Sequence, residues 1–395
     1  MTQVRMPAAE RVPVQVRRAR LATSVVFAIH GTVTGSFASR IPWIRDHVHV
    51  GVGGLGIALI AIGVGAMLSM PFSGRLVHRY SPRILVRALI IAWCLALLLP
   101  ALPSTLWLLA VVMIGYGAAA GLADVAMNAH AVLVEERYGR SVMSGFHGFW
   151  SLGGLIGSGL GALAAHADID ARAHFLAVFV VLSVVSVVVC RWLLADVPDV
   201  DADEPPAFAL PSRPVLLIGL IGLCAVFAEG ASLDWAAVYV RDELHGTAAI
   251  AALGVSALSF TMTGTRLAGD KFVERVGAVA AVRVGAVIST LGTLAVVLAP
   301  NPAVAILGFG IIGAGVAVVE PLVFAAAGRV GPHPGRSIAG AAGVAYGAGL
   351  VAPGVIGGIA KLSSLTVSFI LVAVLTALMG LGAGVLRPAE SQTGG

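Results

Sequence analysis

Long apolar stretches recur along the whole chain, and they restrict its fold more than any other feature. Residues 84–103, 278–299 and 362–386 are examples, and none of them alternates apolar with polar residues. A helix needs about 20 consecutive apolar residues to cross a bilayer, whereas a strand of a membrane barrel needs about ten that alternate. The chain is 58% hydrophobic and only 11% charged, well below the roughly 25% of a soluble domain. These patterns predict an all-α integral membrane protein.

The apolar stretches predict twelve spans. In chain order they cover residues 20–40, 53–74, 84–103, 106–134, 142–165, 172–194, 214–240, 248–268, 278–299, 303–327, 337–360 and 362–386. The connections between them are too short for a soluble catalytic domain, and the sequence has no Gly-rich phosphate loop ending in Lys-Ser/Thr. The Cys residues show no metal-ligand spacing. We therefore expect neither an enzyme nor an ATP-driven pump, and no cofactor or metal.

The basic residues predict which side of the membrane each segment faces. Most of the 25 Lys and Arg residues fall in the N-terminal segment and in every second connection after it. The remaining connections hold Arg40, Arg45, Arg172, Arg241 and Lys361. Under the positive-inside rule, both chain ends are then cytoplasmic. The net charge of +5 reflects this topology and contact with anionic lipid, and nucleic acid is not an expected partner.

The two halves of the sequence repeat each other. One constant shift moves Asp124 onto Glu320, and it moves the Arg-Asp pair 45–46 onto the Arg-Asp pair 241–242. Between the halves lies a hydrophilic segment rich in Pro, Asp and Glu, which is expected to be a flexible linker. The predicted organisation is a six-helix bundle over residues 1–194, a cytoplasmic acidic linker over 195–213 and a second six-helix bundle over 214–395.

The connection after the second span reads GRLVHRYSPR, residues 74–83. It resembles the signature loop of the major facilitator superfamily, in which Gly, an acid, Arg, Gly and a final basic residue recur at fixed spacing. Gly74, Arg79 and Arg83 match that loop, whereas His78 stands where the acid is expected. The resemblance implies twelve helices in two six-helix pseudo-repeats, the number of spans that the apolar stretches predict.

A degenerate copy of this loop lies in the second half as GDKFVERVG, residues 269–277. Gly269, Asp270 and Arg275 match the pattern. In the superfamily this loop locks the cytoplasmic gate through contacts between the halves. The resemblance therefore assigns the matching residues of both copies to a cytoplasmic gate.

Three further segments carry a narrower resemblance. They are ADVAMNAHAVLVEE at 123–136, GFHGFWSLGG at 145–154 and EGASLDW at 229–235. They look like a poorly characterised bacterial subgroup of the superfamily that is related in pattern to fucose-type sugar permeases, which implies location in the bacterial inner membrane. In the fucose-type group an acid four residues before an Asn serves proton coupling, and Asp124 and Asn128 match that spacing. His147 and Trp150 resemble the positions that line the sugar cavity.

Asp124 lies in the middle of an apolar span. A carboxylate at such a depth costs about 2.5–3.5 kcal/mol on insertion scales, so it should face the bundle interior or a cavity. Gly117, Gly121, Asp124 and Asn128 recur at helical spacing and form one stripe of small and polar side chains. This favours a proton-binding carboxylate beside a substrate-contacting Asn128. The alternative is a buried structural ion pair.

The second half carries three more intramembrane acids. Glu320 is the counterpart of the first-half acid, and Pro321 beside it is expected to break the helix there, as happens at many transporter binding sites. Glu229 and Asp234 share the seventh span. We predict that Glu229 and Glu320 take part in proton coupling and that Asp234 contacts the substrate. The alternative for Asp234, about two turns from Arg241, is a gate residue or an ion-pair partner nearer the outside. Arg266, near the end of the eighth span, is expected to snorkel to the cytoplasmic surface.

Ring-bearing residues complete the expected substrate cavity. His30 lies in the middle of the first span, and a structural role is its alternative. His147 and Trp150 lie within one helical turn, and an aromatic face beside a hydrogen-bonding ring suits a polar solute with an apolar face, such as a sugar. Tyr346 is the shifted counterpart of Trp150 and is expected to form a second wall. The alternative for the fifth span is helix packing through its glycines.

These features predict a secondary active transporter that moves a small polar organic solute, with a sugar-like solute favoured. We expect a monomer that couples transport to protons, by symport, and alternates access between its two bundles. One alternative is a proton-antiporting exporter of drugs or metabolites, although the Gly-Pro pair that many such exporters carry in the fifth helix is missing from GGLIGSGLGA, residues 153–162. Another is a membrane sensor with a transporter fold, which usually carries an added output domain.

Overall fold

The computed structural model describes residues 12–139, 142–195, 211–330 and 334–387. Throughout these ranges the secondary structure is helical. The first half contains α1 (Val14–Ser39), α2 (Ile41–Val48), α3 (Val52–Arg79), α4 (Pro82–Ala96), η1 (Leu99–Ala101), α5 (Leu106–Tyr138), α6 (Met143–His166), α7 (Ala171–Val189) and η2 (Cys190–Trp192). The second half contains α8 (Arg213–Asp242), α9 (Ala248–Val276), α10 (Ala278–Val297), α11 (Pro302–Val316), α12 (Val319–Ala327), α13 (Pro334–Leu362), α14 (Leu365–Gly382) and η3 (Ala383–Leu386).

Within the described residues, twelve helical segments are long and apolar enough to cross a membrane. This confirms the predicted number of spans and the all-α membrane fold. Leu291 and Leu307, inside the ninth and tenth spans, are 59% and 63% exposed, and large apolar side chains exposed to this degree are expected on a surface that faces lipid. Most of the expected linker over 195–213 lies outside the described residues.

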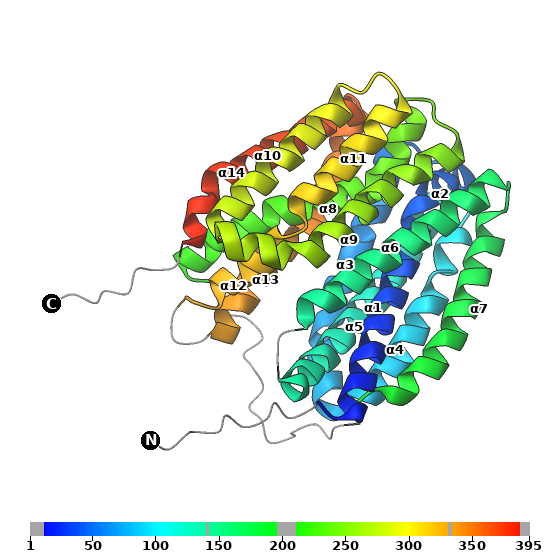
Figure 1. Cartoon of the computed structure of the whole chain (residues 1–395). Helices are drawn as coiled ribbons and strands as arrows, with labels where there is room; N and C mark the ends of the chain where they lie inside the picture. The colour runs from blue at the N-terminus through cyan, green and yellow to red at the C-terminus, as the bar shows by residue number, and fades with distance from the viewer. Residues whose placement is uncertain (1–11, 140–141, 196–210, 331–333, 388–395) are drawn as a thin grey trace, which may run out of the picture.

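The helices form two bundles, α1–α7 and α8–α14 (Figure 1). The bundles meet mainly where α6 packs against α9 and where α3 packs against α13. We call the end of the molecule that carries α2 the α2 end. The opposite end, where α1 begins and α14 stops, is called the terminal end. The ribbons of the two bundles converge at the α2 end and diverge toward the terminal end (Figure 1).

The tenth span is discontinuous, but the break is not at Pro321. Helix α11 stops at Val316, and α12 begins at Val319. A proline has no N–H to donate to the carbonyl four residues earlier, and its ring clashes with that carbonyl. The residue four positions before Pro321 is Ala317, so the helix is interrupted there and Pro321 sits in the first turn of α12. The expected break is therefore confirmed in kind and corrected in position.

Helices α1 and α6 pack with their backbones in contact. A Cβ atom added to Gly31 would lie 1.9 Å from the Trp150 carbonyl oxygen, and one added to Gly157 would lie 2.1 Å from the Thr32 carbonyl oxygen. Only glycine fits at such distances. This close approach confirms the small-residue seam that was the packing alternative for the fifth span.

Candidate functional site

The centre of the bundle interface is organised around Arg266, a residue of α9 that is only 7% exposed. Its Nη1 donates a hydrogen bond to the hydroxyl of Ser151 on α6 at 2.7 Å. Its Nη2 lies 3.4 and 3.3 Å from the two carboxylate oxygens of Glu229 on α8. One guanidinium therefore joins a polar group of the first bundle to a carboxylate of the second. The expectation that Arg266 snorkels to the membrane surface is wrong.

The break in the tenth span contributes a further partner for this guanidinium. Nε of Arg266 donates to the carbonyl oxygen of Ala317 at 3.3 Å. In an unbroken helix this oxygen would accept from the N–H of residue 321, but Pro321 has none. The proline therefore leaves the Ala317 carbonyl oxygen without a backbone donor at membrane depth, and Arg266 supplies the missing hydrogen bond. Irregular backbone inside a membrane requires such a partner.

Glu320, in the first turn of α12, faces the same guanidinium. Its Oε2 lies 3.9 Å from Nη2 of Arg266. Its Oε1 accepts a hydrogen bond of 2.7 Å from the hydroxyl of Tyr346 on α13. The charge of Glu320 also interacts electrostatically with Glu229 and, across the bundle interface, with Asp124. The two repeat-related acids are thus close enough to interact electrostatically, and their role in proton coupling stays a prediction.

Asp124 is held differently, by its own helix. The side-chain amide of Asn128, one turn along α5, donates to Oδ1 of Asp124 at 3.1 Å and to the Asp124 carbonyl oxygen at 2.9 Å. Both side chains are half-buried. We call the set of Asp124, Asn128, Glu229, Arg266, Glu320 and Tyr346 the central site. It draws on both bundles and contains one guanidinium for three carboxylates.

A narrow cavity lies beside the central site, on the side toward the α2 end. Its volume is about 10 Å³, close to the space that one water molecule needs. The first bundle lines it with Thr34, Trp150 and Ser151, and the second bundle lines it with Glu229 and Ser259, among others. Trp150 therefore lines a space between the bundles, and its contact with a substrate stays a prediction.

The two histidines predicted to bind substrate lie in different surroundings. His147 is half-buried, packs edge-on against Phe27 at 5.4 Å, and interacts electrostatically with Glu320 and Arg266. His30 is only 6% exposed. Its Nδ1 accepts from the indole N–H of Trp150 at 3.0 Å, and its ring stacks on Trp93. His147 thus borders the central site, whereas His30 holds the Trp150 side chain in place through the indole hydrogen bond.

Asp234 lies on α8 about one and a half turns nearer the α2 end than Glu229. It is half-buried and interacts electrostatically with Tyr116 of α5, a residue of the other bundle. It therefore faces the bundle interface, at a position nearer the α2 end than the central site and away from Arg266. Its substrate-binding role stays a prediction.

The residues assigned to a cytoplasmic gate are only partly described. The side chains at positions 74, 79 and 270 (Gly74, Arg79 and Asp270) lie outside the described residues. Arg83 donates to the carbonyl oxygen of Arg191 at 2.7 Å, a contact within the first bundle. A Cβ atom on Gly269 would lie 2.6 Å from the Val318 side chain, at the break of the tenth span, and Arg275 is exposed. The gate stays a prediction.

Comparison with known proteins shows which protein family and which relatives this chain is similar to. The family model described as Major Facilitator Superfamily matches residues 23–353. An uncharacterized transporter of Sinorhizobium fredii, y4wD, is 34% identical over 91% of this chain and 96% of its own length. An uncharacterized MFS-type transporter of Yersinia pestis is 32% identical over 90% and 92%. Membrane protein MosC of Rhizobium meliloti is 26% identical over 86% and 83%.

Solved structures with the same fold are more distant in sequence. A point mutant of the nucleoside transporter NupG superposes with a TM-score of 0.75 at 13% identity, over 93% of this chain and 99% of that one. A bacterial homologue of the human lysosomal transporter Spinster, in an inward-facing and unoccupied conformation, superposes with a TM-score of 0.69 at 12% identity, over 94% and 98%. At these identities the likeness concerns the fold alone.

Proposed function

The chain belongs to the major facilitator superfamily, and we propose that this membrane transporter moves a small polar organic solute by secondary active transport coupled to protons. The observation that carries this proposal is the central site. Two carboxylates of the second bundle, Glu229 and Glu320, converge there on Arg266, and Asp124 of the first bundle interacts electrostatically with Glu320 across the interface where the bundles would move against each other. Substrate and coupling-ion sites of such folds lie at this interface, near the middle of the membrane.

The balance of charge in the central site supports proton coupling. Glu229 and Glu320 face the one guanidinium, and Asp124 interacts electrostatically with Glu320, so the site has an excess of negative charge when all three acids are ionised. Like charges at membrane depth are costly unless they are paired or neutralised. Protons that bind and leave as the bundles move would neutralise this excess, and we assign Asp124, Glu229 and Glu320 to that role.

The polar groups around the acids favour a neutral, hydroxyl-rich solute such as a sugar. Asn128, His147 and Tyr346 offer hydrogen-bonding groups, and Trp150 offers an apolar ring face. Aromatic rings beside a few placed polar groups are the usual composition of small-molecule sites. We keep Asp234 as an additional substrate contact nearer the α2 end.

The orientation and state of the transporter follow from the charge distribution and the packing. We propose that both chain ends are cytoplasmic in a bacterial inner membrane, so that the α2 end faces outward. The bundles meet at the α2 end and diverge toward the terminal end (Figure 1), which corresponds to an inward-facing state of a monomer. The linker and the assigned gate loops then lie on the cytoplasmic side, where they would close the opposite state.

The test begins with the purified protein. Thermal-shift screening against sugars, nucleosides and organic acids identifies a solute, and proteoliposomes then measure its accumulation in a pH gradient and its counterflow exchange. Asp124→Asn should abolish accumulation driven by pH and leave exchange largely intact, because the amide keeps the contact with Asn128 but cannot release a proton.

Asp170→Asn is the matched control, since Asp170 caps the exposed start of α7 at the α2 end. This variant should accumulate the solute as the parent does. Unchanged pH-driven accumulation in Asp124→Asn would contradict the assignment of Asp124 to proton coupling. A solute that raises the melting temperature but shows no counterflow would favour a sensor over a transporter.

A further inference from the structure

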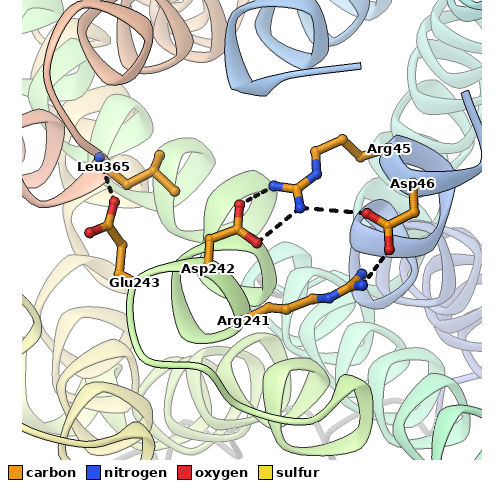
Figure 2. Close-up of polar contacts among 6 residues, drawn as sticks. All are labelled: Arg45, Asp46, Arg241, Asp242, Glu243 and Leu365. Carbon is orange, nitrogen blue, oxygen red and sulfur yellow. Dashed lines mark hydrogen bonds and ion pairs between the residues drawn. The ribbon is translucent and has the colours of Figure 1, made fainter. Parts of the chain in front are cut away.

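Four charged residues join the two bundles at the α2 end (Figure 2). Arg45 and Asp46 come from α2, and Arg241 and Asp242 are the last two residues of α8. Arg45 donates to both carboxylate oxygens of Asp242, with the Nη2–Oδ1 distance at 2.9 Å. Arg241 donates to the carboxylate of Asp46. Both of these ion pairs cross from one bundle to the other.

The two ion pairs are reciprocal. The shift that relates the sequence halves moves the Arg-Asp pair 45–46 onto the Arg-Asp pair 241–242. Each arginine therefore pairs with the aspartate of the other copy, as in the self-complementary interface of a two-fold dimer. Arg45 also lies 3.5 Å from its own neighbour Asp46, which links the two pairs into one network.

We propose that these residues, the α2-end latch, hold the outer ends of the bundles together and limit how often the transporter opens outward. The proposal rests on the alternating-access function proposed above. Opening at the α2 end must pull α2 away from the end of α8, and both ion pairs must then break. Arg266 differs, because its carboxylate partners all lie in its own bundle and it can keep them during such a movement.

The surroundings of the latch suit repeated breaking. The side chain of Arg45 is 15% exposed and that of Asp46 is 44% exposed. An open depression of about 560 Å³ lies beside them, lined by Arg45, Asp46, His49 and Asp242 among others. Water can therefore hydrate the four charges as soon as they separate. Burial alone would lower the pKa of Arg45, but its hydrogen bond with Asp242 and the charges of Asp242 and Asp46 raise it, so this guanidinium keeps its charge.

The next acid along the chain provides a contrast. Glu243 follows Asp242 directly, yet its carboxylate accepts from the backbone N–H of Leu365 at 3.0 Å and so caps α14 within its own bundle (Figure 2). Glu243→Gln and Asp242→Asn are therefore the same chemical change at adjacent positions. Only the second removes a contact between bundles.

The experiment measures outward opening without any substrate. Cys94, Cys190 and Cys224 are replaced by Ala, and Ser158→Cys is introduced as a reporter, because Ser158 is fully buried and accepts a hydrogen bond from Ser256 of the other bundle. A membrane-impermeant maleimide added from the α2 side should label this cysteine only when the α2 end opens. Ser256→Cys serves as a second reporter if the first fails to fold.

Asp46→Asn with Asp242→Asn should speed labelling by up to about 25-fold, since each of the two cross-bundle pairs contributes up to about a factor of five. Arg45→Asp alone should also speed it. Arg45→Asp with Asp242→Arg should return it toward the parent rate, because the 45–242 pair is kept with reversed charge and the Arg241–Asp46 pair is unchanged. Glu243→Gln should label as the parent does.

Equal rates in the parent and in the Asp46→Asn, Asp242→Asn variant would overturn the latch. Labelling that is accelerated equally by Glu243→Gln would also overturn it. So would a charge-reversed variant whose labelling rate does not return toward that of the parent, since the faster labelling would then come from loss of packing. Labelling needs neither solute nor proton gradient, so failure here is separate from failure of the proposed proton-coupled transport.

Discussion

The two repeat-related acids, Asp124 and Glu320, occupy corresponding places in the two bundles but are held in different ways. Asp124 lies in an unbroken helix, and its hydrogen-bond donor is Asn128 of the same helix. Glu320 follows a helix break, and its partners Arg266 and Tyr346 come from two other helices. Within the residues that the structure describes, Glu320 forms an ion pair with a cation and Asp124 does not.

This difference teaches how one site can divide its tasks. A carboxylate held by a guanidinium from a third helix is tied to the geometry of the whole second bundle. A carboxylate held by an amide on its own helix can change its proton without rearranging its neighbours. We expect Asp124 to act mainly in proton exchange, and Glu320 with Arg266 to connect proton binding to the arrangement of helices.

Loss of Arg266 should produce the largest effect. Arg266→Leu leaves Glu229 and Glu320 facing each other without a cation, and breaking a buried pair in this way costs about 3–5 kcal/mol. We expect a lower melting temperature and a loss of uptake of about 100-fold or more. Arg266→Lys should recover part of both, because it restores the charge but not the forked donors. An Arg266→Leu protein as stable as the parent would mean that Glu320 does not depend on its cationic partner.

Repair of the helix break should have an intermediate effect. Pro321→Ala gives position 321 an N–H that competes with Arg266 for the Ala317 carbonyl oxygen. Uptake should fall by about tenfold, in line with the loss of one hydrogen bond, while the melting temperature stays the same or rises. Pro353→Ala is the matched control, since Pro353 is a proline inside another helix, α13, seven residues beyond Tyr346. An equal loss of uptake in Pro353→Ala would contradict a specific role for the break.

The smallest effect is expected at Asn128. Asn128→Ala removes the donor to Asp124, and one such hydrogen bond contributes about 0.5–1.5 kcal/mol. The pH that gives half-maximal uptake should shift, with a change in rate below about tenfold. Asn301→Ala removes a helix cap at the start of α11 and should lower stability without shifting that pH. No shift in Asn128→Ala would mean that Asp124 does not depend on its own helix.

The number of spans and the place of the acids could be predicted from the sequence because both follow from hydropathy along one helix at a time. An acid in an apolar stretch must face the interior whichever helix packs against it. The break of the tenth span was predictable in kind, since proline rules apply locally. Its position at Ala317 follows from the same rule when the carbonyl four residues earlier is considered.

The partners of the central site could not be predicted, because they depend on which helices lie side by side. Arg266 lies near the end of the expected span at 268, but α9 continues to Val276, about 12 Å further. The arginine instead points into the bundle interface, where Ser151 and Glu229 bind it. The signal available in the sequence was the pair of intramembrane acids that need a cation. His30 is a similar case, since Trp93 and Trp150, which enclose it, come from other helices.

The backbone contact of α1 with α6 has a mechanical consequence. Where Gly31 and Gly157 bring two main chains together, no side chain remains that could change rotamer and absorb a displacement. A pair of helices joined in this way is stiff, so a displacement of one helix also displaces the other. Relative movement of α1 and α6 is thereby excluded, and any bending of the first bundle is left to its outer helices.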